Sequence, residues 1–261
     1  MQIAHKAQLI DPAGGDSNSA LRRLVKYFAD TQGLAPSESA PNRFILEQEL
    51  NTIEQHETEQ FRTMCARCHT GARVALQRRS EDEWRNLIHF HLGQFPTTEY
   101  QMMGRDRDWL GQALKEVVPD LAQNYPLQSA AWKQWQDAPK PGFGGRWRVV
   151  GYMPGRGDFS GVMATGAQDG DRYSVEFSGQ FVDGESLSGS GSAIVYTGYE
   201  WRATLQLGDV RYRQVMASSE DGSELTGRMF QRDNNEWGLR MRAVRETAGS
   251  EVLALQPGNA D

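Results

Sequence analysis

The spacing of hydrophobic residues along the chain changes at about residue 140. Before that point, apolar residues recur at the i, i+3, i+4, i+7 spacing of an amphipathic helix, and after it they alternate with polar residues as in a half-buried strand. The clearest helical run contains Leu21, Leu24, Val25 and Phe28. Alternating runs contain Trp147, Val149 and Gly151, then Tyr173, Val175 and Phe177, then Trp201, Ala203, Leu205 and Leu207. The change of period predicts a helical part followed by a β part.

The helical part contains signals for several further helices. Ser80 and Glu83 form a capping-box pattern, which predicts a helix that buries Trp84 and Ile88. Apolar residues also predict a helix over 44–53 and two shorter ones over 109–118 and 127–135, each bounded by proline.

The β part contains about eight short apolar runs, spaced by roughly 10 residues, with Asp-Gly turn signals between several of them. These turn signals lie at 169–170, 183–184 and 221–222. The pattern is typical of an antiparallel barrel or sandwich. The predicted architecture is therefore multidomain, with a helical domain over 1–139, an antiparallel β-barrel domain over 141–247, and the start of a further β domain over 248–261.

Composition adds limits on the function. The chain has 261 residues and a net charge of −6, which argues against a nucleic-acid binder because phosphate contacts require a basic face. No apolar run approaches the roughly 18 residues that a membrane span needs. All five histidines and both cysteines lie before residue 141, so the helical part holds the candidate chemistry.

Both cysteines belong to one motif, Cys65-Ala-Arg-Cys68-His69, whose C-x-x-C-H pattern is the attachment signature of c-type haem. Two cysteines three positions apart lie about one helical turn from each other, so both thiols can reach the vinyl groups of the porphyrin. The following residue, His69, then lies beneath the iron. The absence of a second cysteine pair disfavours a four-ligand zinc site, and no thioredoxin-like βαβ pattern surrounds the motif.

The iron of an electron carrier usually takes a second axial ligand, Met or His. His91 lies 22 residues after His69, and His89 lies on a different face of the same predicted helix. Met102 and Met103 follow in a loop-like stretch. Spacing leaves these four candidates open. The arginines of the motif region, Arg67, Arg73, Arg78 and Arg79, suit either the haem propionates or a solvated helix surface.

Several longer stretches resemble the alpha subunit of quinohemoprotein amine dehydrogenase. In the first half these are residues 24–38, 65–79, 90–94, 105–109 and 118–121, and in the second half 189–194, 199–202 and 227–230. The resemblance covers nearly the whole chain. It includes the Phe90–Gln94 stretch but not the Met102-Met103 pair, and it therefore favours His91 as the sixth ligand.

The resemblance implies a periplasmic heterotrimer that oxidises primary amines. Its alpha subunit contains two c-type haems in a helical cytochrome domain, followed by β domains. A β-propeller subunit and a small subunit bearing cysteine tryptophylquinone complete the complex. The amine is oxidised at the quinone, and the haems pass the electrons to an external cytochrome or copper protein. This chain would then transfer electrons and hold no catalytic residue, with its β domain docking onto partner subunits.

The family has two haem motifs, whereas this chain has one, and its opening residues lack the pattern of a signal peptide. We therefore expect a fragment that covers the second half of a dihaem unit. Two alternatives remain. The chain could be a stand-alone monohaem cytochrome c with a β module, or a haem-free scaffold protein whose motif is inert.

Overall fold

The computed structural model describes residues 17–39, 58–66, 69–98, 108–231 and 238–247. The chain divides into two compact units, Met1–Ala138 and Pro139–Asp261, which are described separately below. The predicted helix over 44–53 and the expected start of a further β domain over 248–261 lie outside the described residues. No helix in the described ranges is long and apolar enough to cross a membrane.

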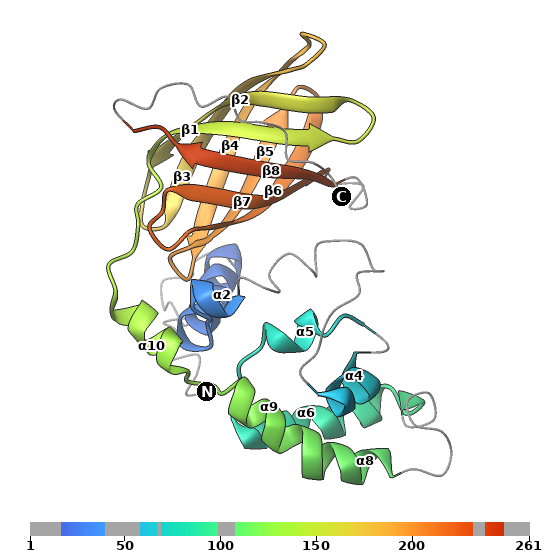
Figure 1. Ribbon diagram of the computed structural model, residues 1–261. Helices are drawn as coiled ribbons and strands as arrows, with labels where there is room; N and C mark the ends of the chain where they lie inside the picture. Colours follow the sequence, from blue (N-terminus) through green and yellow to red (C-terminus); the bar gives the residue numbers. More distant parts are fainter. Residues whose placement is uncertain (1–16, 40–57, 67–68, 99–107, 232–237, 248–261) are drawn as a thin grey trace. The chain divides into compact units, whose positions relative to one another are not determined.

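The first unit is helical in its described residues (Figure 1). Its helices are α2 (Ser17–Thr31), α3 (Pro36–Ser39), α4 (Glu59–Cys65), α5 (Ala72–Ala75), α6 (Glu81–Gln94), α8 (Trp109–Gln112), the π-helical segment η2 (Ala113–Val117), α9 (Val118–Asn124) and α10 (Ala130–Asp137).

The capping box predicted at Ser80 is confirmed. The Ser80 hydroxyl accepts a hydrogen bond from the Glu83 backbone N–H, and the Glu83 carboxylate accepts one from the Ser80 backbone N–H. These two bonds satisfy backbone donors that the first turn of α6 would otherwise leave unpaired. The helix buries Trp84 and Ile88, as the pattern predicted.

The predicted end of the helix over 109–118 was wrong, because the helical backbone continues through Pro119 to Asn124. Proline has no N–H and its ring clashes with the preceding turn of an α-helix. The chain adopts the wider π-helical turn of η2, which ends at Val117, two residues before Pro119. The last helix also begins later than predicted, because the Ser129 hydroxyl accepts from the Trp132 N–H and caps α10 there.

The second unit is a closed barrel of eight antiparallel strands. They are β1 (Gly145–Met153), β2 (Gly157–Ala167), β3 (Arg172–Phe181), β4 (Ser186–Tyr196), β5 (Glu200–Leu207), β6 (Val210–Ser218), β7 (Glu224–Gln231) and β8 (Gly238–Arg245). Each strand pairs with the next in sequence, and β1 pairs with β8 (Figure 1). The expected antiparallel β architecture is thus confirmed as a barrel, and closure leaves no unpaired strand edge.

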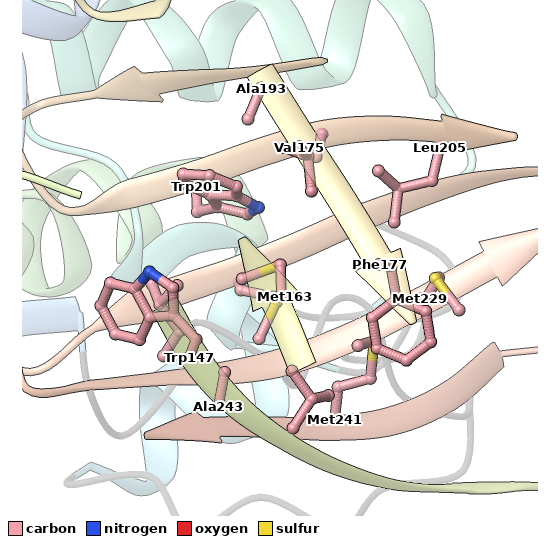
Figure 2. Close-up of a cluster of buried hydrophobic side chains, with 14 of the residues drawn as sticks. Trp147, Met163, Val175, Phe177, Ala193, Trp201, Leu205, Met229, Met241 and Ala243 are labelled. Carbon is pink, nitrogen blue, oxygen red and sulfur yellow. The ribbon is translucent and has the colours of Figure 1, made fainter. Parts of the chain in front are cut away.

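The barrel interior is filled by the apolar side chains of the alternating runs (Figure 2). Trp147, Met163 and Trp201 are fully buried there. Gln214 is a polar exception: its side-chain oxygen accepts a hydrogen bond from the Trp201 indole N–H at 3.1 Å. This bond compensates for the burial of both polar groups.

Phe143 precedes the first strand and inserts into the same core, with 1% of its surface exposed. Its ring lies 5.9 Å from the Tyr173 ring and 6.0 Å from the Trp201 ring, measured between centroids. Its backbone carbonyl accepts from the Trp147 indole and from the Thr165 hydroxyl. Residues 142–144 are further held by Arg245, which donates to the carbonyls of Gly142 and Gly144.

Candidate functional site

The C-x-x-C-H motif begins where α4 ends. Thr58 caps the N-terminus of α4, and its hydroxyl accepts from the Phe61 N–H. Phe61 and Met64 face the core, and Cys65 is the last residue of the helix. Cys68 and Arg67 lie outside the described residues. His69 follows the helix, half-buried, before the short helix α5.

Cys65 packs against the apolar core of the first unit. That core contains Phe61, Met64, Trp84, Ile88, Trp109, Ala113, Val117, Val118 and Leu121. Burial raises the pKa of the Cys65 thiol to about 12, since a thiolate would lose its hydration there. The thiol is therefore held neutral beside apolar side chains, a setting that suits one edge of a porphyrin.

The imidazole of His69 is oriented by its own backbone neighbourhood. Its Nδ1 lies 2.9 Å from the Thr70 carbonyl oxygen, so Nδ1–H donates to that carbonyl and the proton-free nitrogen is Nε2. A hydrogen bond of this kind fixes the tautomer and the ring orientation of a metal-ligating histidine. His69 can thus offer Nε2 to an iron atom.

The candidate sixth ligands differ in their surroundings. His91 is half-buried, and its Nδ1 lies 3.0 Å from the Leu87 carbonyl oxygen, one helical turn earlier. If Nδ1–H donates to that carbonyl, Nε2 is again left free. His89 is exposed on α6, and its ring makes no such bond to the residues that the structure describes. Met102 and Met103 lie outside the described residues, so the choice of ligand remains a prediction.

Two buried polar atoms near the motif have no hydrogen-bond partner within the part of the chain that the structure describes. They are the hydroxyl of Thr70, which follows His69, and the indole nitrogen of Trp109, which belongs to the core around Cys65. An unsatisfied buried polar group costs about 1–3 kcal/mol. A haem has two apolar faces and two carboxylates that accept hydrogen bonds. The residues present therefore fit such a group.

The arginines beside the motif have structural partners. Arg78 is 5% exposed, lies 3.4 Å from the carboxylate of Glu38 and stacks over the Tyr125 ring. Arg79 stacks over Trp84 and donates to the side chain of Gln77. Sequence reasoning missed the Arg78–Glu38 pair, because its members are 40 positions apart. Arg73 is exposed.

A cluster of three or more His, Cys, Asp or Glu side chains that could hold a bare metal ion is not found in the described ranges. In the barrel, the interior is apolar except for residues such as Gln214 and Thr165, whose polar groups bond to neighbouring residues. Among the described residues, those that could hold a cofactor thus lie around Cys65, His69 and α6.

Two family models match the chain. The haem-binding model of the quinohemoprotein amine dehydrogenase alpha subunit matches residues 1–132, and the model of domain II of the same subunit matches residues 141–246. A comparison with curated protein sequences finds no match.

Among solved structures, similar chains include two artificial barrels. One is a redesigned β-barrel bound to DFHBI, with 16% identity over 40% of this chain and 94% of that chain and a TM-score of 0.35. The other is a de novo designed fluorescence-activating β-barrel, with 22% identity over 40% of this chain and 94% of that chain and a TM-score of 0.34.

Proposed function

Since the chain belongs to the family of quinohemoprotein amine dehydrogenase alpha subunits, we propose that it is an electron-transfer subunit that holds a covalent haem c. The observation that supports this proposal best is the arrangement of the motif. Cys65 ends a helix against an apolar core, and the Nδ1 of His69 is occupied by a backbone carbonyl, which leaves Nε2 for iron.

Each residue of the motif has a defined role in the proposal. The thiols of Cys65 and Cys68 would hold the haem through thioether bonds to its two vinyl groups. His69 would bind the iron through Nε2. His91 would bind the iron as the second histidine, also through Nε2, with its ring held by the Leu87 carbonyl oxygen, which accepts from Nδ1–H. The haem supplies one-electron redox chemistry when it is bound.

We extend the proposal to the domains, partners and compartment that membership of the family implies. The first unit is a cytochrome-type helical domain over 1–139, and the barrel domain spans 141–247. A β-propeller subunit and a small subunit with cysteine tryptophylquinone are the partners. The complex lies in the periplasm, oxidises a primary amine at the quinone, and passes electrons through this chain's haem to an external cytochrome or copper protein.

Expression with export and the haem-maturation machinery tests the haem assignment. The denatured chain should show one added haem mass and an alkaline pyridine haemochrome band. Replacement of both cysteines, Cys65→Ala with Cys68→Ala, should abolish the adduct, whereas His89→Ala should retain it. A wild-type chain without an adduct under these conditions would exclude the proposal and favour a haem-free scaffold.

A further inference from the structure

The apolar core beside the haem motif contains two tryptophans that differ in their hydrogen bonding. Cys65 packs against this core, and its members Trp84 and Trp109 are 1% and 2% exposed. The indole N–H of Trp84 donates to the Tyr125 carbonyl oxygen at 3.3 Å. The indole N–H of Trp109 has no hydrogen-bond partner among the residues that the structure describes. Two nearly equally buried rings of one core thus differ in whether the protein pairs their N–H.

Trp109 is held in this core by the helix that it begins. The Asp108 side chain accepts from the Gly111 N–H and caps α8, so that Trp109 is the first helical residue. The Ala113 N–H donates to the Trp109 carbonyl, and residues four positions apart share a helix face. Ala113 is fully buried and begins η2, which is in contact with α4. Because α4 ends at Cys65, the Trp109 ring belongs to the same core as the proposed attachment point of the haem.

The donor restricts the chemistry of its partner. An indole nitrogen only donates a hydrogen bond, whereas the hydroxyl of Thr70, the other unpaired group near the motif, both donates and accepts. The partner of Trp109 must therefore be an acceptor. Hydrogen bonds with a charged acceptor are about twice as strong as those between neutral groups, so a buried carboxylate is the most favourable partner. The charged acceptors of a haem are its two propionates.

An unpaired indole N–H does not by itself identify a haem contact. Trp132 on α10 is 3% exposed, and its indole nitrogen also has no hydrogen-bond partner in the described ranges. Its ring packs elsewhere, since a Cβ added at Gly33 would lie 2.4 Å from it, and it is not a member of the core that Cys65 packs against. The position of Trp109 in that core therefore supports a haem contact, and Trp132 offers a control.

From this arrangement we propose that the Trp109 indole N–H donates a hydrogen bond to a propionate of the haem and thereby raises the reduction potential of the iron. The inference rests on the proposed function, which assigns a covalent haem c to Cys65, Cys68 and His69. The negative charge of a propionate favours ferric over ferrous iron. A hydrogen-bond donor offsets part of this charge and so favours the reduced haem. Trp109 is then a haem-binding residue that adjusts the potential without binding the iron.

The experiment compares the reduction potential of the full haem-bearing chain in wild type and three variants. Trp109→Phe removes the N–H and keeps an aromatic ring in the core. Trp84→Phe is the matched control in the same core, because the Tyr125 carbonyl pairs its N–H. Trp132→Phe is the control for an unpaired N–H outside that core. Spectroelectrochemical titration measures the potentials, and thermal unfolding verifies that each variant folds.

Trp109→Phe should shift the reduction equilibrium towards the oxidised haem about threefold to tenfold, which is roughly 30–60 mV for a one-electron couple. Both controls should shift it by less than about 1.5-fold. An unchanged equilibrium in Trp109→Phe, or an equal shift in Trp84→Phe, would overturn the inference and leave the haem assignment intact. A wild-type chain that attaches no haem would instead contradict the proposed function.

A second variant keeps the test independent of the loss of ring volume. Replacement of Trp109 with benzothienylalanine puts sulfur in place of the indole N–H and keeps the size of the ring, so it serves also where Trp109→Phe does not fold. Infrared difference spectra between the oxidised and reduced states then identify the acceptor. The carboxylate band of isotope-labelled propionates should shift in this variant and not in Trp84→Phe. A lowered potential without a shift of that band would assign the hydrogen bond to another acceptor and refute the inference.

Discussion

Replacement of Phe143 by alanine should destabilise the barrel more than its position outside the strands suggests. The side chain is 1% exposed and lies among Trp147, Tyr173 and Trp201. Alanine would leave a cavity between these three rings. The rings cannot collapse freely into it, because the Trp147 indole donates to the Phe143 carbonyl and the Tyr173 hydroxyl lies 3.4 Å from the Phe143 nitrogen.

The expected loss of stability can be taken from the truncation of buried phenylalanines in other proteins. Truncation of such a residue to alanine costs about 3–5 kcal/mol. For a barrel of roughly 100 residues, an unfolding entropy of about 2.1 cal/mol/K per residue converts this loss into a fall in Tm of about 14–24 °C.

Thermal and urea unfolding of the full chain, followed by near-ultraviolet circular dichroism, measures the change, because the buried barrel residues Trp147 and Trp201 contribute to this signal. Phe95→Ala is the control, because Phe95 is 60% exposed and its truncation should change stability by no more than about 0.5 kcal/mol. A loss below about 1 kcal/mol for Phe143→Ala would refute the assignment of residues 142–144 to the barrel core.

Further predictions concern the barrel wall and the motif. Gly191→Ala should destabilise the barrel, because the added Cβ would lie 1.9 Å from the Thr204 carbonyl oxygen. Gly93→Ala should instead stabilise α6 by up to about 1 kcal/mol, because its added Cβ would meet nothing within 4 Å. Urea unfolding measures both changes in stability. In the haem-free chain, the raised pKa of Cys65 means that the native state keeps its proton while the unfolded state loses it between pH 9 and 12. The contribution of this thiol to the free energy of unfolding, measured as the difference between wild type and Cys65→Ala, should therefore be constant below pH 9 and fall between pH 9 and 12. A contribution that rises over this interval would contradict the burial of the thiol. His91→Ala should convert a low-spin haem spectrum to high-spin and His89→Ala should not; an unchanged Soret band in both would exclude His91 as the ligand.

Much of the barrel could be predicted because strand burial has a period of two. Trp147, Val149, Tyr173 and Val175 all face the interior, as their alternation with polar residues indicated. The turn signal at Asp169-Gly170 also proved correct, since Gly170 has φ +60°, which favours glycine. Periodicity could not distinguish a barrel from a sandwich, because closure depends on the pairing of β1 with β8, about 90 residues apart in the chain.

The helical unit was harder to predict. A proline is a local signal for a helix end, but the π-helical turn before Pro119 lets the backbone continue. The insertion of Phe143 and the pairing of Glu38 with Arg78 depend on contacts between distant residues, which no local pattern contains. The motif itself was recognisable because the covalent attachment of a c-type haem would require two cysteines and a histidine at a fixed spacing, which Cys65, Cys68 and His69 have.

Reduction of this chain's haem by a primary amine tests the central claim most directly. The oxidised haem-bearing chain is mixed with amine, alone and together with the quinone-bearing and β-propeller subunits, and the haem absorption bands are followed by stopped-flow spectroscopy. The account predicts that the reduced bands appear only in the presence of the partner subunits. The contradicting result would be a haem that is reduced by dithionite but not by amine, in a complex that has assembled and oxidises the amine.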